Sequence, residues 1–373
     1  MSDTRNTNGN HRPVPVRDLE RVFRSRPAQR KALIDRTNRI FVRGSENPPT
    51  VVTKVVPTRR EENAGEGIDY EVIIDVQGVR PGVRARPPAL TGDGVKPQAR
   101  ERDEAELERI LTGFIPEHLA FNSMPIQRVK PFRRIRPDYE RDRKVATTVF
   151  PPDNRMVFQD THYPWSTVGL VETNRGSGSG VVIGPRHLLT VSHIIDWTAP
   201  SGFAADWVRF TPSYFDGDAP FGEAYGAHIY WYLQEDGDGF ISGDEGLYDY
   251  VVVVLDQRIG ELTGWMGARG YDDDWDNLDV WSHMGYPGDL NSGQRPVFQG
   301  GFRLDGSDDA AQELLHTGDV CPGQSGGPMF GWWEGDVGPR AVAVQSWQST
   351  ANNGASGGMD LRDLVALART EFA

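Results

Sequence analysis

The pattern of apolar and polar positions changes character near residue 148. Beyond it, short apolar or alternating runs such as WVRF, AHIYWYL and YDYVVVVL are separated by Gly, Pro, Asn and Asp. Closely spaced runs of this kind, broken by turn residues, are typical of the strands of a sandwich or barrel. The last stretch differs, because Leu361, Leu364 and Val365 recur at helical spacing. We therefore predict that residues 361–372 close the chain as an amphipathic helix.

Upstream of residue 148 the periodicity is weaker. Residues 1–65 are rich in Arg, Pro, Asn and Glu, so we expect them to be mostly disordered or extended. The run YEVIIDV at 70–76 predicts one strand, and residues 103–115 predict a helix with one apolar face. The basic stretch at 130–144 is the best candidate for a domain boundary and for proteolytic cleavage.

Charge divides the chain at the same place. The formal net charge is -13, but residues 149–373 carry 32 Asp and Glu against 11 Arg, whereas residues 1–148 have a net charge of +8. Because opposite charges attract, we predict that the N-terminal region docks on the acidic remainder. The basic residues are mixed with carboxylates and accompany no recognised nucleic-acid-binding motif, so we expect no nucleic-acid partner.

Cysteine and hydropathy limit the possibilities further. Cys321 is the only cysteine, which excludes an intrachain disulfide. The first residues lack the apolar stretch of a conventional secretory signal, and no apolar run reaches the roughly 18 residues of a membrane span. We expect no membrane partner, and the sequence leaves the compartment open.

The strongest chemical signal is Ser325 in GQSGGP. A serine hydroxyl is a poor nucleophile at neutral pH and needs a base, an orienting carboxylate and an oxyanion site. The pattern also fits α/β-hydrolases, but their histidine follows the serine, and all eight histidines here precede it. His193 in TVSHII follows an apolar run and a small residue. His187 and His283 lack that context, so His193 is the candidate base.

Several motifs together resemble the chymotrypsin-fold serine proteases, whose catalytic order is His, Asp, Ser. SGVVIGPRHLLTVSH resembles the histidine segment, YDYVVVVL resembles the aspartate before an apolar strand and points to Asp249, and GDVCPGQSGGP resembles the nucleophile loop. GYPG at 285–288 and VFPPDNR at 149–155 are similar to signatures of the disulfide-poor glutamyl endopeptidase branch. The resemblance covers residues 149–373 and not the part before them.

This resemblance implies an all-β fold of two six-stranded antiparallel Greek-key barrels. They would comprise about residues 149–262 and 263–360, with the active site in the crevice between them and the C-terminal helix after them. Residues 1–148 would be a basic propeptide or accessory region. Families of this kind are often secreted.

The resemblance also implies the chemistry of a serine endopeptidase acting on proteins or peptides. Ser325 would attack the scissile carbonyl, His193 would take its proton, and Asp249 would orient the imidazole. The backbone N–H groups of Gly323 and Ser325 would bind the oxyanion. Asp244 and Glu245 are less favoured acids, because they lie in a glycine-rich acidic loop. A catalytically silent binding module and an esterase on the same fold are the alternatives.

Substrate preference is open between two interpretations. Gln345 stands where glutamyl endopeptidases have a histidine that reads a carboxylate, and Asp319 stands where trypsin-like enzymes place the partner of Arg or Lys. Alternatively, Asp319 points away from substrate and caps its loop. Ser346 and Trp347 resemble the strand that holds the substrate backbone. Gln348 replaces the glycine usual after them and would narrow the pocket entrance.

Activation would differ from that of trypsin-like digestive enzymes. Those enzymes carry an aspartate before the nucleophile that pairs with the new N-terminus, whereas this chain has Gln324. By resemblance, cleavage just before Val149 would create the mature N-terminus and release a propeptide. The alternative is that the N-terminal region is a permanent accessory domain.

Residues 234–245, QEDGDGFISGDE, have the spacing of a calcium loop. Asp236, Asp238 and Glu245 are its candidate ligands, but Gln234 departs from the pattern at the first position. The flanking runs look like strands and not like the two helices of an EF-hand. A calcium ion and a plain acidic loop are therefore both possible, and the predicted chemistry requires no cofactor.

Overall fold

Two strands near the N-terminus form a sheet of their own. In the computed structural model, β1 (Thr50–Thr58) pairs antiparallel with β2 (Asp69–Gln77), and only the backbone of these two strands is described. The strand expected at 70–76 is thereby confirmed. The other residues that the structure describes are 12–28, 88–97, 103–126, 149–235, 241, 243–306, 312–349 and 351–373.

The first large sheet closes into a barrel of six antiparallel strands. Its hydrogen-bonded order is β10-β7-β6-β5-β8-β9, and β9 also pairs with β10, which closes the ring. The five residues of β10 are all fully buried, as expected for an apolar run with both faces covered. The strands are β5 (Val168–Thr173), β6 (Gly176–Gly184), β7 (His187–Thr190), β8 (Val208–Pro212), β9 (Ala224–Trp231) and β10 (Val251–Leu255).

The second large sheet curls until its two ends meet. Its order is β14-β15-β18-β17-β16-β12-β13-β4, and β11 pairs with β17. Only Arg303 separates β13 from β14, so the strands near opposite ends of this order are joined directly. The strands are β4 (Met156–Val157), β11 (Gly267–Ala268), β12 (Trp281–Gly285), β13 (Val297–Phe302), β14 (Leu304–Gly306), β15 (Glu313–His316), β16 (Pro328–Gly331), β17 (Arg340–Gln348) and β18 (Asn353–Gly357).

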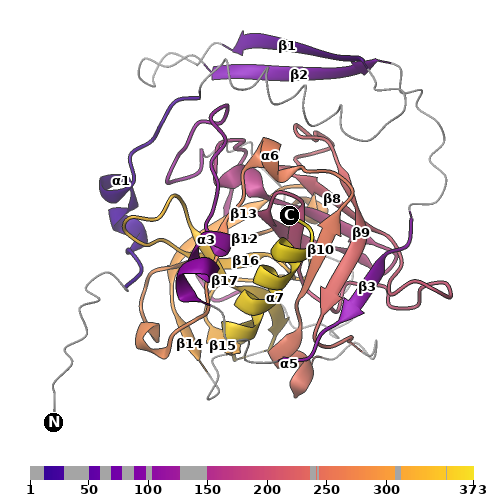
Figure 1. The fold of residues 1–373 in the computed structure, drawn as a ribbon. Coiled ribbons are helices and arrows are strands. Elements are labelled where there is room, and N and C mark those ends of the chain that lie inside the picture. Colours follow the sequence, from indigo (N-terminus) through magenta and orange to yellow (C-terminus); the bar gives the residue numbers. More distant parts are fainter. Residues whose placement is uncertain are drawn as a thin grey trace.

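The predicted all-β architecture with a closing helix is confirmed. Helix α7 (Gly358–Glu371) buries its apolar side and crosses the front of the molecule in Figure 1. One detail differs from the expected first barrel of about residues 149–262, because β4 pairs with β13 in the second sheet. The remaining short helices of this part are η2 (Trp165–Thr167), α5 (Asp244–Tyr248), α6 (Gly260–Thr263), η3 (Asp273–Trp275) and η4 (Asn291–Gly293).

Described segments of the N-terminal region lie on the barrels. Helix α3 (Glu104–Leu111) packs beside α7, and β3 (Thr91–Gly94) adds a parallel strand to β9 (Figure 1). The predicted helix at 103–115 is confirmed, although it ends at Leu111. Upstream, η1 (Val16–Asp18) and α1 (Leu19–Val22) are helical. Residues 12–28 thus contain two short helices within a region expected to be mostly disordered or extended, and a few of their apolar side chains find partners on the barrels.

Apolar contacts dominate the described interface. Leu19, Leu90, Leu107, Leu111 and Phe121 are buried in the same hydrophobic cluster as the barrel strands. Hydrophobic burial supplies about 25 cal/mol per Å² of apolar surface, so side chains of this size contribute substantially. Aromatic pairs add to this contact, since the rings of Phe23 and Trp332 lie 4.9 Å apart and those of Phe114 and Trp265 lie 4.4 Å apart.

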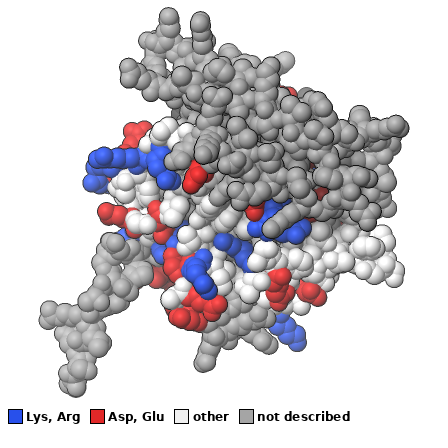
Figure 2. Space-filling view, turned by 45° about the horizontal axis from the view of Figure 1, so that its top comes forward, with Lys and Arg blue, Asp and Glu red and all other residues white. Residues whose placement is uncertain are grey.

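The ion pairs described across this interface have their charges reversed relative to the net charges of the two regions, which are positive for the N-terminal region and negative for the remainder. Arg340 on β17 binds Glu108, and Arg362 on α7 lies 3.7 Å from Glu104. In both pairs the N-terminal region supplies the acid. On the face drawn in Figure 2, blue and red side chains of the described residues lie next to one another. Docking driven by overall charge therefore stays a prediction. The described contacts between the N-terminal region and the barrels are largely apolar.

No helix within the described ranges is both long enough and apolar enough to cross a membrane.

Candidate active site

His193 and Asp249 are joined by two hydrogen bonds. His193 follows β7, and Asp249 lies between α5 and β10, the strand that pairs with β7. The backbone N–H of His193 donates to Asp249 Oδ1 at 2.9 Å, and its ring Nδ1 lies 2.7 Å from Oδ2. Pairing of β7 with β10 thus brings together two residues that are far apart in the sequence. The imidazole keeps Nε2 for another partner.

The surroundings of Asp249 favour a protonated His193. The Ser346 hydroxyl donates to Asp249 Oδ2 at 2.6 Å, so the carboxylate accepts three hydrogen bonds while its side chain is only 1% exposed. Burial disfavours the imidazolium, but the charge and hydrogen bond of Asp249 outweigh it and raise the pKa of His193 above its ordinary 6.5. The arrangement suits a base that must accept a proton.

The other candidates for the base and for the orienting acid lie in different surroundings. His187 Nε2 is 3.1 Å from the Ala368 carbonyl, and burial lowers the pKa of His187 to about 3. His283 Nδ1 lies 3.1 Å from the Pro328 carbonyl, and burial lowers its pKa to about 4. Both are buried, neutral side chains that contact the backbone. Asp244 and Glu245 lie within α5, and it is Asp249 that binds His193.

Ser325 sits in a tight turn that only glycines on either side permit. Gly323 has φ +101° and Gly326 has φ +82°, in the region that L side chains rarely adopt. A Cβ on Gly323 would lie 2.4 Å from the Tyr286 carbonyl oxygen, and one on Gly326 would lie 2.2 Å from the Ser179 carbonyl oxygen. The glycines of GQSGGP therefore let the backbone fold closely against β6 and the GYPG segment.

One side chain of the first barrel holds this turn. The backbone N–H of Ser179 donates to the Ser325 carbonyl at 2.7 Å, and its hydroxyl donates to the Gly323 carbonyl at 2.7 Å. The same hydroxyl accepts the N–H of Tyr286 at 2.9 Å. Ser179 thus ties the nucleophile turn to β6 and to the GYPG segment at once.

The turn lies next to the His193 segment. A Cβ on Gly178 would meet the Ser325 carbonyl oxygen at 2.9 Å and Ile194 Cδ1 at 3.0 Å. From the other side, the N–H of Gly326 donates to the Gln345 carbonyl, one residue from the Ser346 that binds Asp249. The backbone of Ser325 therefore lies close to the His193 segment and to the strand whose Ser346 binds Asp249.

The backbone N–H groups of Gly323 and Ser325 remain available. The neighbouring N–H of Gln324 donates to the Cys321 carbonyl at 3.1 Å, which closes the turn. Within the described part of the chain, those of Gly323 and Ser325 donate no hydrogen bond. Free N–H donors on either side of Gln324, in the turn that carries the serine, are what an oxyanion site requires.

Asp319 is buried, and two backbone groups of the 149–155 segment bind it. Its Oδ1 accepts the N–H of Phe150 at 2.7 Å, and its Oδ2 accepts that of Asn154 at 2.8 Å. Burial raises the pKa of Asp319, although these two hydrogen bonds act against it. Both carboxylate oxygens are thus engaged with the chain itself, as in the interpretation that Asp319 caps its loop.

The side-chain amide of Gln345 is also hydrogen-bonded within the chain. Its Oε1 lies 2.8 Å from His316 Nε2, and its Nε2 donates to the carbonyls of Trp347 and Gly354 at 2.9 and 3.2 Å. His316 Nδ1 accepts the N–H of Gly318, which places the ring proton on Nε2. Burial lowers the pKa of His316 to about 3, so this ring is neutral.

The remaining predicted substrate residues are on β17. The ring of Trp347 covers Gly354, where a Cβ would approach it to 2.1 Å, and its Nε1 donates to Glu313 at 2.9 Å. Ser346 bonds with Asp249 as described above. The Oε1 of Gln348 is buried and has no hydrogen-bond partner among the described residues. Gln348 thus offers a free acceptor beside the site.

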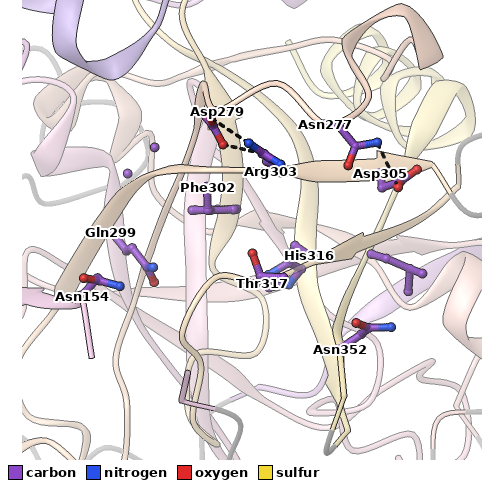
Figure 3. Close-up of a pocket in the computed structure, with 13 residues that line it drawn as sticks. Asn154, Asn277, Asp279, Gln299, Phe302, Arg303, Asp305, His316, Thr317 and Asn352 are labelled. Carbon is purple, nitrogen blue, oxygen red and sulfur yellow. Dashed lines mark hydrogen bonds and ion pairs between the residues drawn. The ribbon is translucent and has the colours of Figure 1, made fainter. Parts of the chain in front are cut away.

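The lining of a polar cavity of about 750 Å³ includes Asn154, Gln299 and His316, which bind Asp319 or Gln345. Figure 3 shows Gln299, Asn154 and His316 on its wall, together with the ion pair between Asp279 and Arg303. Gln299 Oε1 accepts the N–H of Asp319 at 2.7 Å. The cavity wall therefore shares residues with the hydrogen bonds that hold Asp319 and Gln345.

The proposed calcium loop is only partly described. Asp236 and Asp238 lie outside the described residues, and Glu245 is the second residue of α5. Among the residues that are described, no three metal-ligating side chains cluster. Calcium binding at 234–245 stays a prediction.

Sequence reasoning missed three kinds of residue. Ser179 and His316 act through contacts with residues distant in the chain, and the motifs give no local sign of this. Arg155 lies within the VFPPDNR motif, which gives it no role of its own, yet its guanidinium binds Gln324 beside the nucleophile. The sequence gives one sign of this contact. VFPPDNR contains an arginine, and GQSGGP has the uncharged Gln324 before the serine.

Comparison with known proteins identifies one curated relative. Over 186 residues, the chain is 25% identical to a glutamyl endopeptidase of Bacillus licheniformis, in a match that covers 50% of this chain and 55% of the relative. The chain thus spans about half the length of that relative. The resemblance to glutamyl endopeptidase-like serine proteases inferred from the motifs is confirmed. No protein-family model matches the chain.

Two solved structures of proteases match part of the chain. A Glu endopeptidase in complex with MPD matches with 21% identity and a TM-score of 0.48, covering 60% of this chain and 99% of that one. The protease Anisep from Arthrobacter nicotinovorans matches with 17% identity and a TM-score of 0.45, covering 58% of this chain and 99% of that one.

Proposed function

We propose that the chain is a serine endopeptidase that hydrolyses peptide bonds through an acyl-enzyme. The observation that carries this proposal is the double hydrogen bond between His193 and a buried Asp249, next to which the turn of Ser325 lies close to Ile194. A serine next to a histidine whose other ring nitrogen is fixed by a carboxylate is the arrangement needed for nucleophilic attack at neutral pH.

In the first step, Ser325 Oγ bonds to the scissile carbonyl carbon while its proton passes to His193 Nε2. The carbonyl oxygen becomes an anion, which the N–H groups of Gly323 and Ser325 bind. His193 then gives the proton to the amine, the C–N bond breaks, and an ester to Ser325 remains. Water, deprotonated by the same histidine, hydrolyses that ester and restores the serine.

A fluorophosphonate probe tests this proposal. It should label the wild-type chain at Ser325, Ser325→Ala should lose all labelling, and exposed Ser201→Ala should be labelled normally. Cleavage of a peptide library should fall in parallel with labelling. A wild-type chain that stays unlabelled, whether intact or cleaved before Val149, would sink the proposal and favour a silent binding module.

An esterase is the second alternative. It would label with the same probe but leave the peptide library intact while hydrolysing simple esters. Peptide cleavage at a rate that depends on Ser325 separates the two activities.

For specificity, we propose that neither Asp319 nor Gln345 reads a charged substrate side chain. The support is that their polar atoms already bind Phe150, Asn154 and His316. Buried polar groups that are satisfied internally have little to gain from a ligand. The peptide library should then show no preference for Arg, Lys or Glu before the scissile bond.

A further inference from the structure

Arg155 is a buried cation fixed on two sides. Its side chain is 1% exposed, and the guanidinium binds both Asp153 and Asp289. The Asp289 pair is a two-point contact, with Nη1 to Oδ1 at 3.0 Å and Nη2 to Oδ2 at 2.6 Å. Nε and Nη2 reach Asp153 at 3.1 and 3.0 Å. Paired, planar contacts of this kind fix the direction of every remaining N–H.

The second N–H of Arg155 Nη1 points towards the nucleophile turn. Arg155 Nη1 also donates to Oε1 of Gln324 at 3.0 Å, and Gln324 is fully buried immediately before Ser325. The same Oε1 accepts the backbone N–H of Cys321 at 3.1 Å, and Nε2 faces the Asp319 carbonyl at 3.4 Å. One carboxamide thus joins the guanidinium to the segment 319–321, which leads into the turn that presents Gly323 and Ser325.

The cation of this cluster is Arg155, set between the carboxylates of Asp153 and Asp289, and not a chain terminus. Burial disfavours the guanidinium charge, yet Asp289 and Asp153 raise the pKa of Arg155 above its ordinary value. Gln324 carries no charge, so the side chain immediately before the nucleophile offers no carboxylate to a new N-terminal ammonium. A side chain that is already in the sequence supplies the cation on which the turn rests.

We propose that Arg155 is a positioning residue for the oxyanion donors, acting through Gln324, and that the turn takes its working shape without cleavage before Val149. This inference rests on the proposed endopeptidase function. It assigns to the VFPPDNR segment a role in holding the nucleophile turn.

The test compares variants in the full-length chain, with its intact mass confirmed. Gln324→Met keeps the volume but removes the acceptor, and should slow fluorophosphonate labelling by about 10- to 100-fold, because small displacements of catalytic groups cost about this much. Gln324→Glu keeps the acceptor and should label several-fold faster than Gln324→Met. For a cleaved peptide, kcat should fall while KM stays within about twofold, since binding does not use the oxyanion donors.

Matched controls separate positioning from general stability. Arg155→Lys keeps a positive charge between the aspartates but cannot reach three partners, so it should lose activity to the same extent as Gln324→Met. If Gln324→Met fails to melt cooperatively, Arg155→Lys is the variant that tests the proposal. Arg340→Lys alters another buried arginine, held by Asp336 and Glu108, and should label at the wild-type rate despite a lower melting temperature. Gln312→Met is the corresponding glutamine control.

Two results would overturn the inference while leaving the endopeptidase intact. One is a Gln324→Met chain that melts cooperatively and is labelled within twofold of the wild-type rate. The other is a wild-type chain that is labelled only after cleavage before Val149. By contrast, absence of labelling in both forms of the wild type defeats the proposed function itself.

Discussion

At the scale of single residues, the candidate site depends on carboxylates whose oxygens are fully engaged. Asp249 accepts hydrogen bonds from His193 and Ser346, and Asp319 accepts two from the 149–155 segment. A carboxylate that accepts two or three hydrogen bonds through both of its oxygens cannot rotate without losing one of them. The two aspartates therefore act as fixed points, one for the imidazole and one for the backbone beside the nucleophile turn.

The pH dependence of activity should follow His193. Because its pKa is raised, the neutral base forms only above the ordinary 6.5, and kcat/KM should rise with pH through a midpoint higher than that value. Asp249→Asn should lower this midpoint and reduce kcat by about 10⁴-fold. The free energy of unfolding should depend on pH in the opposite sense. The charged pair stabilises the fold below pH 6.5, and this contribution disappears as pH rises through the raised pKa. A pH–rate profile with an unshifted acid limb would contradict this assignment.

Asp319→Asn separates the two interpretations of that residue. The amide offers one acceptor where two N–H groups need one each, so we expect a loss of about 1–3 kcal/mol in the free energy of unfolding. The order of preferred residues in a peptide library should stay unchanged. If Asp319 instead pairs with basic substrates, the variant should selectively lose cleavage after Arg and Lys. Urea denaturation and the library digest together decide.

The sequence predicted the residues that carry local signatures. Ser325, His193 and Asp249 each sit in a motif whose neighbours are small or apolar for reasons visible within a few positions. Arg155 and its partner Gln324 are 169 positions apart, and their contact depends on how two loops meet. No periodicity reports such a contact, so it emerged only from the fold.

At the scale of elements, burial explains which ones could be predicted. Strand β10 is a continuous apolar run, and α7 has an apolar side at helical spacing, so both stand out in the sequence. Strand β3 reads TGDG, with no apolar residue at all. It is a strand because the edge of β9 offers hydrogen-bond partners to its backbone, which is a property of the partner and not of the segment.

Helix α3 offers a test of how tightly the N-terminal region is coupled to the barrels. Leu111 is 2% exposed and belongs to the common core, so Leu111→Ala should cost about 2–5 kcal/mol. We expect the urea midpoints of tryptophan fluorescence and of fluorophosphonate labelling to fall together. Exposed Glu106→Ala on the same helix should change neither by more than about 0.5 kcal/mol. Labelling that survives unchanged in Leu111→Ala would show separate folding.

At the scale of the whole molecule, the two regions share one core and not merely complementary charge. If the chain is cut before Val149, the N-terminal piece should remain bound, because Leu90, Leu107 and Phe121 would otherwise be exposed to water. Gel filtration should show both pieces co-eluting in 1 M NaCl, where exposed charges are screened over about 3 Å, and separating only in denaturant. Release by salt alone would favour charge-driven docking of a propeptide.

Strand β3 also determines how the protease half would behave alone. It covers the stretch of β9 from His228 to Trp231, which has β10 on its other side. Without residues 88–97, that stretch would present unpaired N–H and C=O groups along an open strand. Open strands recruit strands from other molecules, so a fragment beginning at Val149 would tend towards self-association. A segment with no apolar residue thereby contributes to the solubility of the whole chain.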